Sequence, residues 1–253
     1  MSCDGLRGRA ALITGASSGI GRGVAVAFAR QGARVAVNYP DPAERPAAEA
    51  VCGLIDEAGG EAIAIEADVS VEDDVARMVR STRDAFGGID ILVNNAGIAH
   101  TAPIQDIPVA TWDRLIAVHL RGTFLTTRLV LPGMYEAGFG RIINTASQLA
   151  YKGSPGLTHY TAAKGAIIAM TRSLALEVGA RDVTVNCVAP GATRTPILDD
   201  VPRELIEQIR QSIPLGRLAE VDDIVPTYVF LASDEARHYQ GQCLSPNGGD
   251  VFL

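Results

Sequence analysis

The sequence predicts a single-domain α/β fold, in which a doubly wound parallel sheet of about seven strands carries helices on both faces. Short apolar runs rich in β-branched residues alternate along the chain with longer segments of helical period. Strands that are separated by helices pair in parallel through right-handed crossovers. No linker, low-complexity stretch or internal repeat divides the 253 residues. We therefore expect one domain over residues 1–253.

The predicted elements follow one another in a regular order. Strands are expected at residues 10–14, 34–38, 61–65, 90–93, 141–145, 183–188 and 242–245. After the first strand, Ile20, Val24 and Phe28 fall on one face of a helix. Further helices are expected at 43–57, before Gly59-Gly60; between the third and fourth strands, on Val71, Val75 and Val79; and at 160–178.

The segment 191–214 departs from this order. It contains Pro196, Pro202 and Pro214 and follows a predicted strand, with a short helix expected at 202–211. It is longer than most connections in compact domains, and such segments are often lids or binding loops. We interpret it as a substrate-loop insertion.

Composition excludes several classes of partner. The net charge is −7, and the 22 Lys and Arg residues are scattered, so the sequence indicates no nucleic-acid-binding face. Cys3, Cys52, Cys187 and Cys243 match no metal-binding spacing, and no metal is expected. The start has no signal-peptide apolar run, and charges interrupt every apolar stretch. We expect a cytoplasmic protein without membrane association.

A glycine-rich turn, TGASSGIG at residues 14–21, joins the first strand to the first helix. Its glycines let the backbone turn sharply and approach a pyrophosphate, whose charge is stabilised at a helix N-terminus. The spacing is not GxGxxG, and a purely structural glycine turn is the alternative. The residues of the turn that we expect to contact a dinucleotide are Gly15, Ser17, Ser18, Gly19, Ile20 and Gly21.

Other short motifs follow the remaining strands at the carboxyl edge, where open α/β sheets bind ligands. They are Asp68 and Val69 after the third strand, Asn95, Ala96 and Gly97 after the fourth, Ser147 after the fifth, Tyr160 and Lys164 on the next helix, and Pro190 and Gly191 after the sixth. With these motifs in this order, the chain resembles the short-chain dehydrogenase/reductase family. The resemblance covers nearly the whole chain, as far as Gly248-Gly249.

Tyr160 and Lys164 stand four residues apart on one helix, so they lie on the same face. A neighbouring ammonium and the positive nicotinamide of an oxidised cofactor favour tyrosinate and lower the tyrosine pKa. The phenol can then take a proton from an alcohol or donate one to a carbonyl. Ser147 can hold the same oxygen, and Lys164 can reach the ribose. The family assigns the same roles; taken alone, all three residues could instead be structural.

The chain departs from the family at His119, where an asparagine is usual. In the family, the main-chain carbonyl at this position holds a water of the proton relay. Three interpretations remain: a main-chain role, an imidazole that joins the relay because histidine titrates near ~6.5, and a packed histidine.

The end of the second strand bears on the choice of cofactor. An acidic residue there binds the ribose hydroxyls of NAD, and a basic one accepts the phosphate of NADP. Tyr39 stands where NAD users have Asp, so the sequence favours NADP(H) over NAD(H), with Arg22 and Arg45 as candidate phosphate partners. The resemblance further implies that Asp68 meets the adenine and that Thr195 binds the nicotinamide carboxamide.

The predicted substrate pocket contains Ser147, Gln148, Tyr151 and Tyr160. Family members reduce 3-oxoacyl groups on a carrier protein or oxidise sugars and other secondary alcohols. The segment 134–140 lacks the basic residues that meet an acidic carrier, which favours a sugar, a polyol or a small carbonyl compound. A 3-oxoacyl-thioester reductase is the alternative, and a non-catalytic dinucleotide sensor is the alternative of another class.

The resemblance also implies a homotetramer or homodimer. Its interface would be formed by the helices around 113–131 and 160–178.

Overall fold

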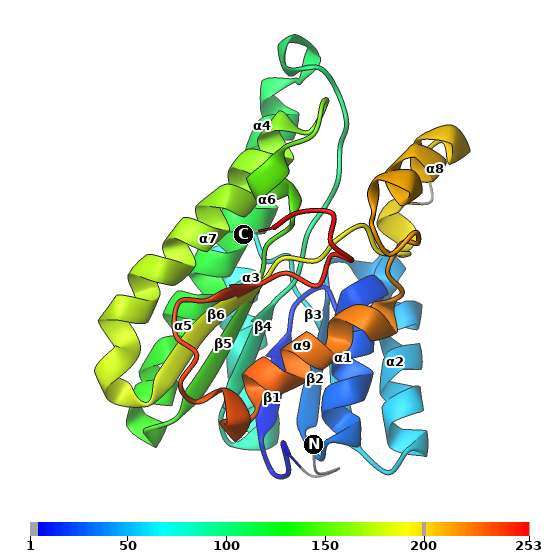
Figure 1. Cartoon of the computed structure of the whole chain (residues 1–253). Helices are drawn as coiled ribbons and strands as arrows, with labels where there is room; N and C mark the ends of the chain where they lie inside the picture. The colour runs from blue at the N-terminus through cyan, green and yellow to red at the C-terminus, as the bar shows by residue number, and fades with distance from the viewer. Residues whose placement is uncertain (1–4, 199–200, 253) are drawn as a thin grey trace.

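The computed structural model describes residues 5–198 and 201–252. Seven strands form one parallel sheet in the order β3-β2-β1-β4-β5-β6-β7 (Figure 1). The strands are β1 Ala10–Ile13, β2 Arg34–Tyr39, β3 Glu61–Glu66, β4 Ile91–Asn94, β5 Gly140–Thr145, β6 Val183–Val188 and β7 Cys243–Leu244. The order reverses between β1 and β4, and a ligand crevice opens at such a switch point in doubly wound sheets.

Helices cover both faces of the sheet (Figure 1). One core cluster packs α1, α2 and α9 against the strands, and a second packs α3, α5 and α7 against the other face. The helices are α1 Gly19–Arg30, α2 Arg45–Glu57, α3 Glu72–Phe86, α4 Val109–Ile116, α5 Gly122–Ala137, α6 Leu149–Lys152, α7 Thr158–Val178, α8 Arg203–Ser212 and α9 Val221–Ala232. The predicted fold class is confirmed.

Burial explains why these segments form these elements. All four residues of β1 are buried, as expected for a parallel strand that is covered on both faces. On α1, Val24 and Phe28 are buried, as their spacing predicts. The prediction for Val71 was wrong, because it precedes α3 and is 43% exposed, whereas Val75 and Val79 are buried.

The segment 191–214 contains α8 and a short 3-10 helix, Pro196–Leu198. Thr193 forms an isolated parallel bridge with Ala219, which anchors the start of the segment beside α9. In Figure 1, α8 stands at the carboxyl edge of the sheet, away from the layers of the core. This placement puts the predicted substrate loop beside the site motifs.

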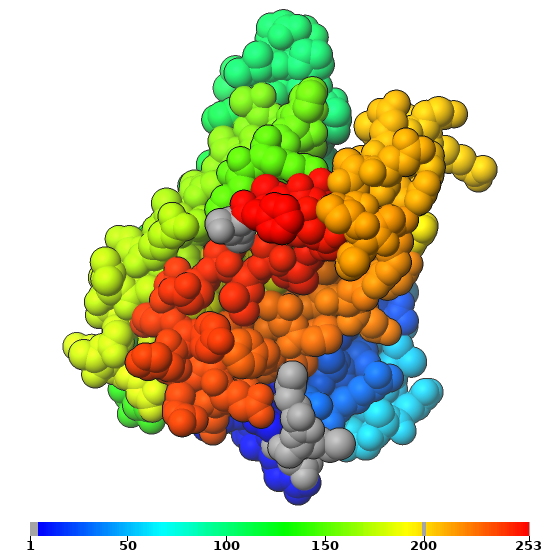
Figure 2. All heavy atoms as spheres, viewed as in Figure 1, coloured from blue at the N-terminus to red at the C-terminus, as the bar shows by residue number. Residues whose placement is uncertain are grey.

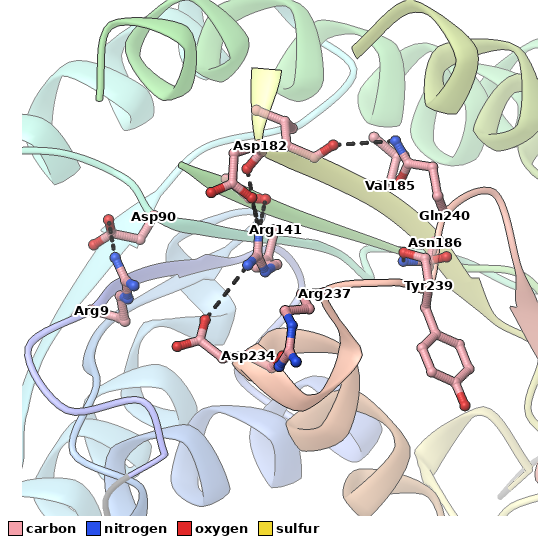
Figure 3. Close-up of polar contacts among 12 residues, drawn as sticks. Arg9, Asp90, Arg141, Asp182, Val185, Asn186, Asp234, Arg237, Tyr239 and Gln240 are labelled. Atoms are coloured by element: carbon pink, nitrogen blue, oxygen red, sulfur yellow. Dashed lines mark hydrogen bonds and ion pairs between the residues drawn. The ribbon is translucent and has the colours of Figure 1, made fainter. Parts of the chain in front are cut away.

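A buried arginine closes the opposite, amino edge of the sheet (Figure 3). The guanidinium of Arg141 lies 3.5 Å from Asp234 Oδ1 and 3.7 Å from Asp182 Oδ1, and its side chain is 3% exposed. The guanidinium carbons of Arg141 and Arg9 lie 4.2 and 3.5 Å from the centroid of the Phe139 ring. The polar ends of β5 and β6 are thereby covered far from the carboxyl edge.

No described helix is both long and apolar enough to cross a membrane.

Candidate active site

The glycine turn is held in place by hydrogen bonds from two neighbouring strands. The amide of Gly15 donates to Asn38 Oδ1 at 3.1 Å, at the end of β2. After β4, Asn95 Nδ2 donates to the carbonyls of Thr14 (3.1 Å) and Gly15 (3.0 Å). Thr14 Oγ1 accepts from the amides of Asn95 and Ala96, each at 3.0 Å. The turn and the segment 95–97 therefore form one rigid unit.

Two glycines of this unit, Gly15 and Gly21, leave no room for a side chain, and Gly19 has the left-handed backbone that favours glycine. A Cβ on Gly15 would lie 2.8 Å from Ala96 Cα, and one on Gly21 would lie 2.2 Å from the Gly15 carbonyl oxygen. At Gly19, φ is +54°, and a Cβ would be 3.4 Å from Thr195. The backbone can approach a ligand closely here, at the N-terminus of α1, where an anion is stabilised. These residues fit a pyrophosphate.

Asp68 and Val69, which the sequence predicts to contact the dinucleotide, differ in their surroundings. Asp68 Oδ1 accepts from the amide and hydroxyl of Ser70, and Arg114 lies 2.8 Å from Asp68 Oδ2. Burial raises the pKa of Asp68, but the Ser70 and Arg114 contacts outweigh it, and the pKa lies below its ordinary value. Val69 is buried against Gly122. Asp68 is thus held ionised at the end of β3.

The side chain of Tyr39, a predicted cofactor-binding residue, is packed in the core. It is 2% exposed and belongs to the core cluster of α1 and α2. Arg45 lies 5.8 Å from its ring centroid and pairs with Glu66 at 3.0 Å. A side chain that is packed in the core offers little surface to a ligand, so the β2 end presents mainly backbone.

Ser147, Tyr160 and Lys164 come together at the carboxyl edge. Ser147 follows β5, and Tyr160 and Lys164 lie one turn apart on α7. Tyr160 forms a side-chain hydrogen bond with Ser147, and Lys164 Nζ lies 5.7 Å from the Tyr160 ring centroid. Lys164 Nζ donates to the Thr145 carbonyl at 2.7 Å, which leaves an ammonium two further donors. The hydroxyl, phenol and ammonium are therefore arranged in a chain.

The charges of this group are strongly affected by burial. Burial lowers the pKa of Lys164 to about 7. The pKa of Tyr160 is raised by burial, and its hydrogen bond with Ser147 acts in the opposite direction. The effect of burial outweighs that of Ser147, whereas the lowered pKa expected from the sequence depends also on the positive nicotinamide of an oxidised cofactor.

His119 lies in a five-residue π-helix, Ala117–Arg121, between α4 and α5. Its Nε2 is 2.8 Å from the carbonyl oxygen and 3.1 Å from the amide of Ile98, and its ring meets Tyr160 edge-on at 5.5 Å. Its main-chain carbonyl accepts from Thr123 Oγ1 at 2.7 Å. Burial and then the charge of Lys164 lower the pKa of His119 to about 3. The ring is therefore neutral near pH 7 and supports the side of Tyr160.

The predicted residues after β6 also reach this edge. The Pro190 carbonyl accepts from the amide of Gln148 at 3.1 Å. A Cβ on Gly191 would lie 2.7 Å from Asn247 Cα, so the C-terminal segment packs directly on this turn. Gln148 is buried, whereas Tyr151 is 37% exposed.

Sequence reasoning missed several residues of the site. Asn38 orders the glycine turn, and its signal was a polar residue in an otherwise apolar strand. His159 is fully buried, and its Nε2 lies 3.1 Å from His100 Nδ1, which ties the loop after β4 to the start of α7. Asp250 contacts Gln148, and no local pattern indicated this. Among the described residues, no group of three or more His, Cys, Asp and Glu is arranged to hold a metal.

Comparisons with known proteins agree with this geometry. The family model described as enoyl-(acyl carrier protein) reductase matches residues 15–250. A (2S)-[(R)-hydroxy(phenyl)methyl]succinyl-CoA dehydrogenase subunit, BbsD, of Thauera aromatica is 43% identical over 97% of both chains. The 3-oxoacyl-(acyl-carrier-protein) reductase FabG of Staphylococcus aureus is 40% identical over 95% of this chain and 97% of its own.

Solved structures show the same likeness. A dehydrogenase/reductase from Sinorhizobium meliloti superposes with a TM-score of 0.92 at 37% identity, over 99% of this chain and 98% of its own. A Beutenbergia cavernae protein described as an NAD(P)-dependent gluconate 5-dehydrogenase, with NADP bound at low occupancy, gives 0.92 at 36% identity, over 98% of both chains.

Fold and comparisons together define an NAD(P)-dependent oxidoreductase. The chain belongs to the short-chain dehydrogenase/reductase family.

Proposed function

We propose that this protein transfers a hydride between NADP(H) and the carbon of a ketone or secondary alcohol, with Tyr160 as the proton donor or acceptor. The observation that carries the proposal is the chain from Ser147 through Tyr160 to Lys164 beside the glycine turn. In reduction, Tyr160 gives its phenolic proton to the carbonyl oxygen as hydride reaches the carbon. Ser147 holds that oxygen, and Lys164 binds the ribose and favours tyrosinate.

The cofactor supplies the hydride, and this chain supplies its binding site. The residues proposed to hold it are Gly15, Ser17, Ser18, Gly19, Ile20, Gly21, Asp68, Val69, Asn95, Ala96, Gly97, Tyr160, Lys164, Pro190, Gly191 and Thr195, with Tyr39 through its backbone. The close packing of Gly15 on Ala96 and the position of Thr195 over Gly19 support this assignment.

A preference for NADP(H) is supported by the end of β2. No carboxylate stands at Tyr39 or Pro40 to bind ribose hydroxyls. Arg45 lies beside Tyr39 and is half exposed, so its guanidinium can approach a phosphate, although Glu66 competes for it. The Beutenbergia relative has NADP bound.

We favour a sugar, a polyol or another small polar carbonyl compound as substrate, with the segment 191–214 as its cover. A 3-oxoacyl thioester is a second candidate, because both curated relatives are named for thioester substrates. Against a carrier-borne thioester, Glu136 stands in the segment before β5, and Arg181 stacks on Tyr135 at 4.6 Å.

We also infer that the protein associates with a second copy of itself through α5 and α7. An apolar hollow of about 530 Å³ lies between these helices, lined by Ile116, Leu120, Arg121, Phe124, Ala166, Ala169 and Met170. Phe124 is 49% exposed there, and a clustered apolar surface is typical of an interface.

The experiment that tests the catalytic proposal follows reduced nicotinamide by its absorbance, with both cofactors. The panel contains sugars, polyols, secondary alcohols, diketones and 3-oxoacyl esters, and Tyr160→Phe is run in parallel. Turnover that is lost in Tyr160→Phe is the expected result. Equal turnover in both proteins would refute the role of Tyr160, and tight cofactor binding without any turnover would favour a non-catalytic sensor.

A further inference from the structure

The C-terminal segment after β7 lies between the substrate loop and the catalytic residues. Figure 2 shows this segment, in red, between the orange atoms of the α8 region and the green atoms toward α6 and α7. Two glycines with positive φ, Gly248 and Gly249, lead into Asp250, and a Cβ on Gly248 would be 2.8 Å from Ile213. The backbone therefore passes tightly beneath the end of α8 and delivers one carboxylate to the site.

The carboxylate of Asp250 joins three segments. Its Oδ2 accepts from Gln148 Nε2 at 2.7 Å and from Lys152 Nζ at 2.5 Å. Its Oδ1 accepts from Ser212 Oγ, at the end of α8, at 3.4 Å. The Asp250 side chain is 4% exposed, so these contacts are largely shielded from water.

The contact with Asp250 fixes the orientation of the Gln148 amide. An ionised carboxylate only accepts hydrogen bonds, so the NH₂ group must face it and the carbonyl oxygen must face away. That oxygen, Oε1, is buried and has no partner among the described residues. An unpaired buried acceptor is costly, which indicates a partner brought by a ligand.

Gln148 is well placed to meet a substrate. It directly follows Ser147, and its main-chain N–H donates to the Pro190 carbonyl in the turn after β6. The Asp250 carboxylate is already paired with Lys152. The missing partner of Oε1 is a hydrogen-bond donor, and a hydroxyl of the substrate satisfies this condition.

We propose that Gln148 Oε1 accepts a hydrogen bond from a hydroxyl on the carbon next to the reacting carbon, and that Asp250 is the positioning residue that holds this acceptor in place. The preferred substrates are then α-hydroxy ketones and the vicinal diols formed from them. This inference rests on the proposed function, because it assumes that the reacting carbonyl lies at Ser147 and Tyr160.

The test compares 2-hydroxy-2-methylcyclohexanone with 2-methylcyclohexanone, which lacks only the hydroxyl. Binding of each ketone to the full-length protein loaded with oxidised NADP is measured by calorimetry, because neither a ketone nor a tertiary alcohol has a hydride to give to the oxidised cofactor. The hydroxy ketone is expected to bind about tenfold more tightly. In Asp250→Asn the new side-chain amide can donate as well as accept, so the side-chain amide of Gln148 can flip. This variant is expected to reduce the preference to about twofold or less.

Two further variants separate positioning from general damage. In a Gln148→Leu background, Asp250→Asn should have no further effect on the preference, since the two residues act through one contact. Asp223→Asn removes a carboxylate from its 2.5 Å pair with Arg217 outside the site and should leave the tenfold preference unchanged.

Three results would overturn the inference: equal binding of the two ketones, no measurable binding of the hydroxy ketone, or a preference that Asp250→Asn leaves intact. Turnover is measured separately with reduced cofactor and Tyr160→Phe. Loss of the proposed catalytic function would thus be seen independently of the hydroxyl preference.

Discussion

The imidazole of His119 is held as a neutral group against Tyr160. Its pKa is about 3, so its charge does not change between pH 5 and 9. We expect the pH–rate profiles of the native enzyme and His119→Asn to superimpose over this range, with kcat/KM lowered less than about tenfold. Loss of general acid–base assistance would cost about a hundredfold or more. A limb of the profile that disappears in the variant would establish the imidazole as part of the relay.

Burial makes the charged form of Lys164 unfavourable in the folded protein. Its pKa is about 7 in the native protein and 10.5 in the unfolded chain, so between these values the unfolded chain binds the extra proton. Stability therefore rises with pH through this window, and the contribution is lost as the pH falls toward 7. Between pH 7.0 and 9.5, we expect the native protein to gain on the order of 2 kcal/mol more unfolding free energy than Lys164→Met.

Urea unfolding at the two pH values measures this difference, and other groups that titrate in the window are common to both proteins. An equal gain in unfolding free energy in the two proteins would show that burial does not disfavour the charged form of Lys164.

At the scale of elements, the tight packing of the glycine turn is the feature on which the proposed cofactor binding depends. A methyl group at Gly21 would strike the Gly15 carbonyl and Asn95 Nδ2, at 2.2 and 2.5 Å. We expect Gly21→Ala to weaken NADPH binding by about tenfold or more, measured by fluorescence titration, since the turn must open to admit the methyl. Gly53→Ala is the matched control: it also lies in a helix, but in open space, and should stabilise the protein by about 0.5–1 kcal/mol without changing affinity. Unchanged affinity in Gly21→Ala would show that the turn does not cradle the cofactor.

The elements were predictable where local pattern and tertiary packing agree. The apolar run of β1 and the 3.6-residue spacing on α1 are local signals, and both elements formed at the expected places. The π-helix around His119 gave no such signal, because its local sequence continues an ordinary helix between α4 and α5. The burial of Tyr39 depends on how α1 and α2 pack over β2, which strand propensity does not describe.

Contacts within the site were likewise predictable where the residues are close in sequence and not where they are far apart. Tyr160 and Lys164 are neighbours on one helix, so their spacing alone brings them together. Asp250 reaches Gln148 across 102 positions of sequence, and only the completed sheet places the C-terminal segment beside β5. Long-range polar contacts of this kind have no local sequence signature.

At the scale of the whole molecule, different groups of residues gather at the amino and carboxyl ends of the parallel strands, which are the amino and carboxyl edges of the sheet. The amino edge holds the Arg141 cluster, in which the Phe139 ring contacts two guanidinium groups. The carboxyl edge holds the glycine turn, the Tyr160 group and the C-terminal segment. The length of the strands separates the two ends. We therefore expect substitutions at the Arg141 cluster to act on folding through lost packing, and those at the carboxyl edge to act on ligand binding.

We infer that the outer faces of α5 and α7 form the interface between copies of the chain. Phe124 projects from α5 at 49% exposure beside the apolar hollow, and a two-fold interface would bury the same patch on both copies. We expect sedimentation velocity at micromolar concentration to show an oligomer for the native chain and a shift toward monomer for Phe124→Glu, because the new carboxylate would be desolvated. Leu54→Glu, at 41% exposure on α2, controls for the loss of an exposed apolar residue and should leave the oligomer intact. A native monomer, or an equal response to both substitutions, would place the interface elsewhere.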